Sequence, residues 1–266
     1  MSIAETAYDP ITSTAQVALW VGCFVFALQA SIHWCRTGCV ASRARQHELL
    51  STSTAACAAL FYFGMANGIS EASYATAGQR SRLYYSFLYL ERGLCVGLLF
   101  LNTSTLARER RPTMVALGVL WLLSTAALYM GNAVVGTRRL GFLVASILCL
   151  LPVATVLVCA MGERVKMSQL QTIYRFLSAW CILCCSGYVI VYTLCEVAYI
   201  LDTETEILVY MLLDFCTTGI SSVIISCAGS DLEAGLLPAQ EAELSLYPGP
   251  HNYGFYPNPD FYNDNL

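Results

Sequence analysis

Seven long apolar stretches constrain this chain more than any other feature of its sequence. Each reaches or approaches the roughly 20 residues with which an α-helix crosses a bilayer's hydrocarbon core. Continuous apolar runs exclude the alternating strands of a membrane barrel, and backbone groups in lipid must be hydrogen-bonded within a helix. We therefore expect an all-α membrane protein, a seven-transmembrane-helix bundle. The predicted spans are 15–35, 50–69, 84–107, 114–135, 140–161, 173–200 and 207–228.

The composition excludes several functional classes. With 57% hydrophobic and 12% charged residues, the chain carries about half the charge of an average soluble domain. The 13 cysteines fall mostly within the spans, where cysteine packs as a small hydrophobe, and their spacing predicts no metal site. The sequence contains no nucleophile–base set and no phosphate-binding loop. We expect an integral protein of the plasma membrane or an endomembrane that is not an enzyme and binds no nucleic acid.

The distribution of basic residues predicts the orientation. Arginines and Lys166 gather in the connections after the first, third and fifth spans, which places those connections in the cytoplasm. The predicted organisation is an extracellular leader (1–14), a bundle (15–229) and a cytoplasmic tail (230–266) rich in Tyr, Pro and Asn. The leader lacks a basic n-region, so the first span is read as a retained helix. The tail's composition is typical of disorder, and Asn258-Pro-Asp-Phe261 looks like a trafficking-adaptor motif.

Ionisable residues inside the spans carry the functional signal, because each is costly in lipid unless it faces the bundle interior. Glu91 and Arg92 lie deep in the third span, and Asp214 lies deep in the seventh. Glu196 and Glu206 lie nearer the outer surface. Two interpretations of these residues remain open, an acidic pair and a solvated rim. We interpret Glu91, Arg92 and Asp214 either as an ion pair that fixes helix packing or as a site that moves or senses an ion or ligand.

Three of the predicted spans each contain a distinct motif. The second contains Tyr62-Phe-Gly-Met65-Ala-Asn-Gly, the third reads Tyr89-Leu-Glu91-Arg92-Gly-Leu-Cys95-Val96-Gly97-Leu-Leu-Phe-Leu-Asn102, and the seventh contains Leu212-Leu-Asp214-Phe-Cys-Thr-Thr218-Gly219. Their order and spacing resemble helices two, three and seven of the microbial (type 1) rhodopsins, over roughly residues 15–229.

The resemblance implies a role for each matched position. It sets Glu91 at the counterion carboxylate and Asn102 at the cytoplasmic proton-donor position of the pumps. The other implied positions are Asp214 as second counterion, Glu196 and Glu206 as outer proton-release carboxylates, and Tyr188, Tyr192 and Met65 as candidate pocket-lining residues. A competing match sets Arg82 at the family's third-helix arginine, but it puts Tyr85 at the counterion and Val96 at the donor.

The departures from the family pattern are more informative than the matches. Thr218 stands where the family has the lysine that binds retinal, and the chain's one lysine, Lys166, belongs to a connection. Arg92 replaces a tryptophan of the retinal pocket, and Leu88 replaces an arginine. The chain resembles a lysine-lacking, opsin-related member with no covalent cofactor. We hypothesise that Arg92 replaces the Schiff-base cation between Glu91 and Asp214 and fills part of the cavity. In the alternative, the match is off by a turn and Arg92 pairs locally.

Three functions remain open on the sequence alone. The first is a light-insensitive, regulatory or interaction protein that works in the lipid bilayer with copies of itself or with other membrane proteins. The second is a retinal-independent conduit for protons or cations through a Glu91/Asp214 core. The third is a receptor for noncovalent retinal or another small apolar ligand.

Overall fold

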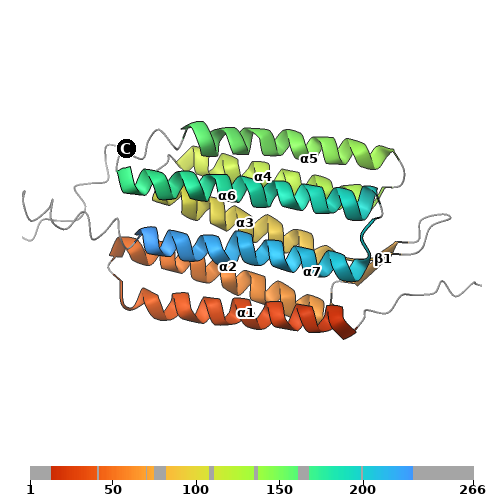
Figure 1. Ribbon diagram of the computed structural model, residues 1–266, viewed down its shortest axis with the longest axis horizontal. Helices are drawn as coiled ribbons and strands as arrows, with labels where there is room; N and C mark the ends of the chain where they lie inside the picture. Colours follow the sequence, from red (N-terminus) through yellow and green to blue (C-terminus); the bar gives the residue numbers. More distant parts are fainter. Residues whose placement is uncertain are drawn as a thin grey trace, which may run out of the picture.

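The computed structural model describes residues 13–40, 42–69, 71–74, 82–107, 111–134, 137–160, 168–198 and 200–229. Within these ranges the chain forms seven α-helices that run side by side in one bundle (Figure 1). The helices are α1 (Ser13–Thr37), α2 (Ser42–Ala66), α3 (Ser86–Leu106), α4 (Arg111–Asn132), α5 (Arg138–Thr155), α6 (Ser168–Tyr192) and α7 (Thr203–Asp214). The predicted seven-helix bundle is confirmed.

Three π-helical segments continue the last three helices. They are η1 (Val156–Ala160) after α5, η2 (Thr193–Val197) after α6 and η3 (Phe215–Ile220) after α7. Helical structure continues beyond η3, so the last rod runs from Thr203 to Gly229. The hydropathy pattern predicted continuous helices here and gave no sign of the wider turns.

The helices close into a ring. Each of α1 to α5 packs against the next helix in the chain, and α7 contacts both α6 and α1. The segment η3 also contacts α2 and α3, so this part of the last rod faces the centre of the bundle. Residues of α3 and η3 that are far apart in the sequence therefore meet in the interior.

A short hairpin joins α2 to α3. Strand β1 (Glu71–Tyr74) pairs antiparallel with β2 (Arg82–Tyr85), with Glu71 opposite Tyr85. The predicted third span began at Tyr84, which the structure assigns to β2, because the apolar and aromatic residues of this strand are indistinguishable from a helix start by hydropathy. Arg82 lies on the strand ahead of α3, so the competing match would put the family's helical arginine outside the helix.

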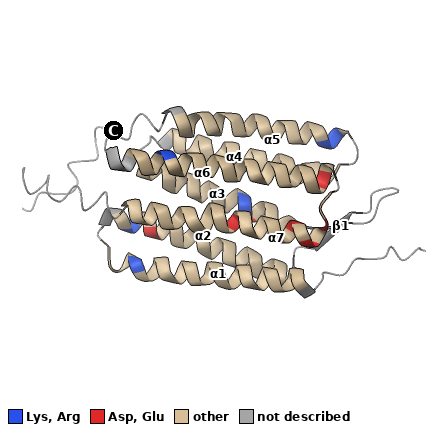
Figure 2. Cartoon of the chain, in the orientation of Figure 1, with Lys and Arg blue, Asp and Glu red and all other residues tan. Residues whose placement is uncertain are grey.

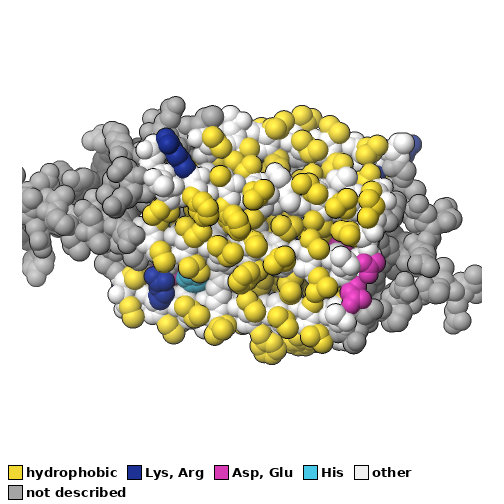
Figure 3. All heavy atoms as spheres, viewed as in Figure 1, with side chains coloured by type: hydrophobic (Ala, Val, Ile, Leu, Met, Phe, Trp, Pro, Cys, Tyr) yellow, Lys and Arg dark blue, Asp and Glu magenta, His cyan; other side chains and the backbone are white. Residues whose placement is uncertain are grey.

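Six of the described helices are long and apolar enough to cross a membrane, with α5 and η1 counted as one rod. Helix α3 is not among them, because Glu91 and Arg92 interrupt its apolar sequence. Instead α3 buries Glu91, Arg92 and Asn102 inside the bundle. Apolar side chains are spread over the whole length of the bundle face in Figure 3, with charged side chains near its ends, as expected for a surface that contacts lipid.

Helix α2 begins well before its predicted start. It starts at Ser42 instead of Leu50, so His47 and Glu48 lie on the helix and are buried. Residues 1–12, Lys166 and the tail 230–266 lie outside the described residues. The predictions for the leader, the tail and the orientation therefore stay predictions.

Candidate functional site

A buried group of charged residues lies where α3 meets the last rod. Glu91 and Arg92 are neighbours on α3, and Asp214 is the last residue of α7 before η3. Their exposed fractions are 1%, 3% and 0%. Figure 2 shows how few charged residues the helices carry between the two ends of the bundle. Such charges are costly to bury without partners, so their contacts define what the site can do.

Asp214 is bound by two tyrosine hydroxyls and lies close to one arginine. Tyr62 of α2 donates to Oδ2 at 2.6 Å, and Tyr188 of α6 donates to Oδ1 at 2.7 Å. The Nε atom of Arg92 lies 3.9 Å from Oδ1. Hydrogen bonds to an ionised carboxylate are stronger than neutral ones. Residues from three helices, α2, α3 and α6, thus converge on one carboxylate of α7.

Arg92 lies within a group of tyrosine rings. Its guanidinium carbon is 3.4 Å from the ring centroid of Tyr210 and 5.3 Å from the centroids of Tyr89 and Tyr188. A guanidinium over an aromatic face is attracted by the ring's quadrupole. The indole of Trp121 donates to the Arg92 carbonyl oxygen at 2.8 Å, which fixes the backbone at this point of α3. The side chain thus occupies the space between α3, α6 and α7.

Thr218 lies on η3, one turn beyond Asp214. It is 2% exposed, and its hydroxyl donates to the Asp214 carbonyl oxygen at 2.7 Å. A threonine has no amine, so this position offers no group that condenses with an aldehyde. The hydroxyl, its only polar side-chain group, is already used in this local hydrogen bond.

Glu91 is not part of the hydrogen-bonded cluster around Asp214. Among the described residues, neither of its carboxylate oxygens has a hydrogen-bond partner. The Cys95 thiol lies beside it, one turn along α3, but donates to the Thr54 carbonyl oxygen at 3.5 Å. Adjacent residues on a helix point about 100° apart. Arg92 and Glu91 can therefore point in different directions, although Glu91 stays close enough to both Cys57 of α2 and Asp214 to interact with them electrostatically.

The three candidate pocket-lining residues are all buried but do not form one wall. Met65 belongs to the main apolar core together with Tyr188, whose ring stacks on Tyr210 with centroids 6.3 Å apart. Tyr192 belongs to a separate cluster with Tyr89, Leu128 and Leu143. The sequence match did not anticipate this separation.

The two outer carboxylates are buried, each 5% exposed, and do not form a solvated rim. Arg139 of α5 lies 3.7 Å from the Glu196 carboxylate, measured from Nη1 to Oε2, and also donates to the Glu196 carbonyl oxygen. Arg139 lies between the predicted spans 114–135 and 140–161, where a connection was expected, yet only 6% of the residue is exposed. At Glu196 the structure therefore has a buried ion pair.

Asn102, which the resemblance sets at the pumps' proton-donor position, lies in a polar contact between α3 and α2. Its Oδ1 is 2.7 Å from Nδ1 of His47, and its amide nitrogen donates to Ser51 Oγ at 3.1 Å. The amide also donates to the His47 carbonyl oxygen at 3.3 Å. This contact fixes the ends of α2 and α3 relative to each other.

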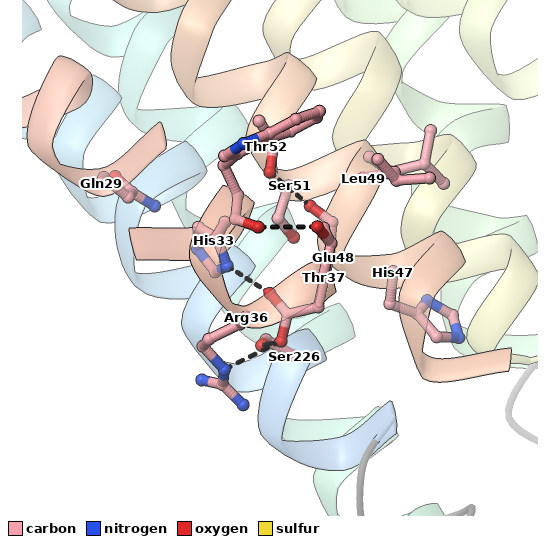
Figure 4. A network of polar contacts seen from close by, with 12 residues as sticks. Gln29, His33, Arg36, Thr37, His47, Glu48, Leu49, Ser51, Thr52 and Ser226 are labelled. Atoms are coloured by element: carbon pink, nitrogen blue, oxygen red, sulfur yellow. Dashed lines mark hydrogen bonds and ion pairs between the residues drawn. The ribbon is translucent and has the colours of Figure 1, made fainter. Parts of the chain in front are cut away.

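The strongest polar network was missed by the sequence analysis (Figure 4). Glu48 of α2 is fully buried, with Oε2 2.7 Å from His33 Nδ1 and Oε1 3.0 Å from Arg36 Nε. The Ser226 hydroxyl also donates to Oε1. The network joins α1, α2 and the last rod. The available signal was the spacing of His33 and Arg36, three residues apart on one helix face, opposite a carboxylate in the next helix.

No group of metal-ligating side chains occurs among the described residues. No family model matches the chain, and no curated protein sequence matches it. Solved structures do match, and they are microbial rhodopsins.

Three of these structures illustrate the likeness. Acetabularia rhodopsin I has a TM-score of 0.78 at 19% identity, covering 84% of this chain and 97% of that one. The light-driven proton pump LR (Mac) from Leptosphaeria maculans has a TM-score of 0.77 at 19% identity, with the same coverage. The light-driven proton pump CsR from Coccomyxa subellipsoidea has a TM-score of 0.77 at 20% identity, covering 82% and 97%. The chain has the microbial rhodopsin fold, which these light-driven proton pumps share.

Proposed function

We propose that this chain is a light-insensitive, opsin-related membrane protein without covalently bound retinal, which acts through contacts with other membrane proteins. One observation carries the proposal: the guanidinium of Arg92 lies 3.4 Å from the Tyr210 ring centroid and 3.9 Å from Asp214. In the microbial rhodopsins that the chain resembles, the protonated retinal Schiff base is the cation that lies beside the second counterion. Here a permanent side-chain cation takes that place.

The chemistry of position 218 agrees with this proposal. A retinal Schiff base needs an amine, and Thr218 supplies a hydroxyl that is bonded to the Asp214 carbonyl oxygen. Without a chromophore that isomerises and a Schiff-base proton that can move, the site has no light-driven step. An arginine keeps its charge at any physiological pH, so it holds one charge state where a pump must alternate between two.

A retinal titration tests the proposal. The purified chain and its Thr218→Lys variant should give no visible absorption with all-trans retinal, because the Arg92 side chain occupies the pocket and repels a second cation. The double variant Thr218→Lys/Arg92→Trp removes that cation and should give a visible pigment. A coloured Thr218→Lys single variant would overturn the proposal that Arg92 closes the pocket. In vesicles with retinal, illumination of the unmodified chain should leave the internal pH unchanged.

A second candidate function is a proton or cation conduit, and Glu91 is the observation that favours it. Its carboxylate is 1% exposed and has no hydrogen-bond partner among the described residues, as in a site that binds and releases a cation. Passive proton flux into vesicles distinguishes the two functions. A flux that Glu91→Gln abolishes supports the conduit, whereas equal fluxes in the two chains, no larger than in empty vesicles, support the interaction role.

A further inference from the structure

A groove runs along the outer surface of the bundle between α1 and the last rod. It has a volume of about 420 Å³ and lies against both helices from Val25 to Arg36 on α1 and from Phe215 to Ile224 on the last rod. Its walls are apolar side chains, among them Leu28, Ile32 and Val223, which are exposed on the bundle surface. This surface faces lipid, so hydrocarbon chains are the molecules that meet the groove.

The floor of the groove is a polar contact between the two helices. Gln29 donates from Nε2 to the Gly219 carbonyl oxygen at 3.1 Å. A Cβ atom at Gly219 would lie 3.1 Å from the Phe215 ring and 3.4 Å from Gln29 Oε1. A small residue here lets α1 and the last rod approach closely.

One end of the groove carries cationic and hydrogen-bonding groups. Arg36 contacts Glu48 through Nε, and 37% of its side chain is exposed. His33 also lines the groove; its Nδ1 contacts Glu48, while its Nε2 has no hydrogen-bond partner among the described residues, although the side chain is 98% buried. In Figure 3 a histidine and an arginine lie side by side at one end of the apolar surface over α1 and α7.

Among the described residues, the exposed charge at this end of the bundle is positive. Arg45 at the start of α2 and Arg175 near the start of α6 are both exposed at the same end of the bundle. Among the described residues there, Glu48 is the one carboxylate, and it is fully buried and paired. An anionic group that approaches Arg36 from the membrane surface therefore meets no exposed acid among the described side chains.

The length and chemistry of the groove select the occupant. The stretch from Val25 to Arg36 is about 16 Å long at 1.5 Å per residue. Its lining is mostly apolar along this length and ends at a partly exposed arginine, so an extended hydrocarbon chain with an anionic headgroup matches both the lining and the charge.

We propose that this groove is a binding site for one anionic phospholipid. One acyl chain lies along Leu28, Ile32 and Val223, and the headgroup phosphate binds Arg36, beside His33. The site is independent of the proposed function, because it shares no residue with the Arg92 core.

Native mass spectrometry of the purified full chain tests the site, with phosphatidylglycerol and phosphatidylcholine of matched acyl chains as probes. We expect one phosphatidylglycerol to be retained in preference to phosphatidylcholine. The variant Arg36→Gln should lower that retention about five-fold, as expected for the loss of one basic contact to an anionic lipid, whereas Arg175→Gln should not. Free glycerol phosphate should not displace the lipid, because it lacks the acyl chain.

A second pair of variants leaves all charges in place. Val223→Trp fills the groove, and Val119→Trp adds the same side chain to α4; both valines are 47% exposed. Only the first should lose the bound lipid. Equal retention of both lipids, or retention that survives Val223→Trp, would overturn the proposal. So would a groove occupied by a second copy, seen as a lipid-independent dimer that Val223→Trp abolishes. If Arg36→Gln does not fold, the valine pair alone decides.

Discussion

Replacing Arg92 by Gln should destabilise the bundle because it leaves Asp214 without its cation. At 3.9 Å and an effective dielectric of about 20, the attraction between the two charges is about 4 kcal/mol. Removing one partner of a buried pair costs about 3–5 kcal/mol, since the other charge stays buried. The contact of the guanidinium with Tyr210 adds about 1–2 kcal/mol.

Two contacts moderate this cost. The hydroxyls of Tyr62 and Tyr188 remain on Asp214 at 2.6 and 2.7 Å, and each continues to stabilise the carboxylate. We therefore expect Arg92→Gln to lower the free energy of unfolding by about 3 kcal/mol, the lower end of the range for a broken buried pair. Arg175→Gln, at an exposed arginine, should change it by less than about 0.5 kcal/mol.

A double-mutant cycle with Asp214→Asn isolates the interaction. Unfolding in mixed micelles, followed by tryptophan fluorescence, gives the four free energies; Trp121 reports on the site directly because it donates to the Arg92 carbonyl oxygen. The double variant removes both charges, so its cost should fall short of the sum of the single costs by about 2 kcal/mol, within the range measured for contacting residues. Additivity within about 0.5 kcal/mol would refute the Arg92–Asp214 interaction.

Three further predictions concern single contacts, each measured in the same unfolding assay. Tyr62→Phe and Tyr188→Phe each remove one hydrogen bond to the Asp214 carboxylate and should cost about 1.5–3 kcal/mol, whereas a loss below about 0.5 kcal/mol would mean that the carboxyl is not ionised. Glu48→Gln leaves Arg36 and His33 without their shared anion and should cost about 3 kcal/mol; Glu204→Gln, on a half-exposed acid, is its control. Gly131→Ala should destabilise because the new Cβ meets the Tyr192 hydroxyl, while Gly118→Ala, with nothing within 4 Å, should stabilise by about 0.4–1 kcal/mol; the reverse order would contradict the packing of α4.

The seven helices were predictable because each contains an apolar stretch whose length reaches or approaches that of a membrane span. The charged residues of α3 and α7 were predictable for the opposite reason, since an ionisable group in an apolar span has to face the interior. The contact between Arg92 and Tyr210 was not predictable from the sequence, because it depends on how the last rod is rotated relative to α3. Nothing in the local sequence of η3 fixes that rotation.

The network around Glu48 was missed for a different reason. Residues Ser42 to Glu48 include two arginines, a glutamine and a histidine, so a hydropathy average assigns them to a connection. The structure extends α2 through them, because Glu48 and His47 find partners on α1 and α3 that offset the cost of burial. Hydropathy sums over a window, whereas burial is decided by pairs of side chains on different helices.

The buried carboxylates of the described residues differ in their partners, and the difference locates the remaining question about function. Three of the five lie beside an arginine: Glu48 beside Arg36, Asp214 beside Arg92 and Glu196 beside Arg139. Glu206 is buried in the first turn of α7. Neither carboxylate oxygen of Glu91, which is equally buried, has a hydrogen-bond partner within the described residues. Because a buried carboxylate without a partner is costly in a dry interior, Glu91 is a group whose burial the described contacts do not offset. A group that does not stabilise the fold is where a transported or sensed ion would act. Glu91, and not the Arg92–Asp214 pair, is therefore the residue whose replacement separates a conduit from an interaction protein.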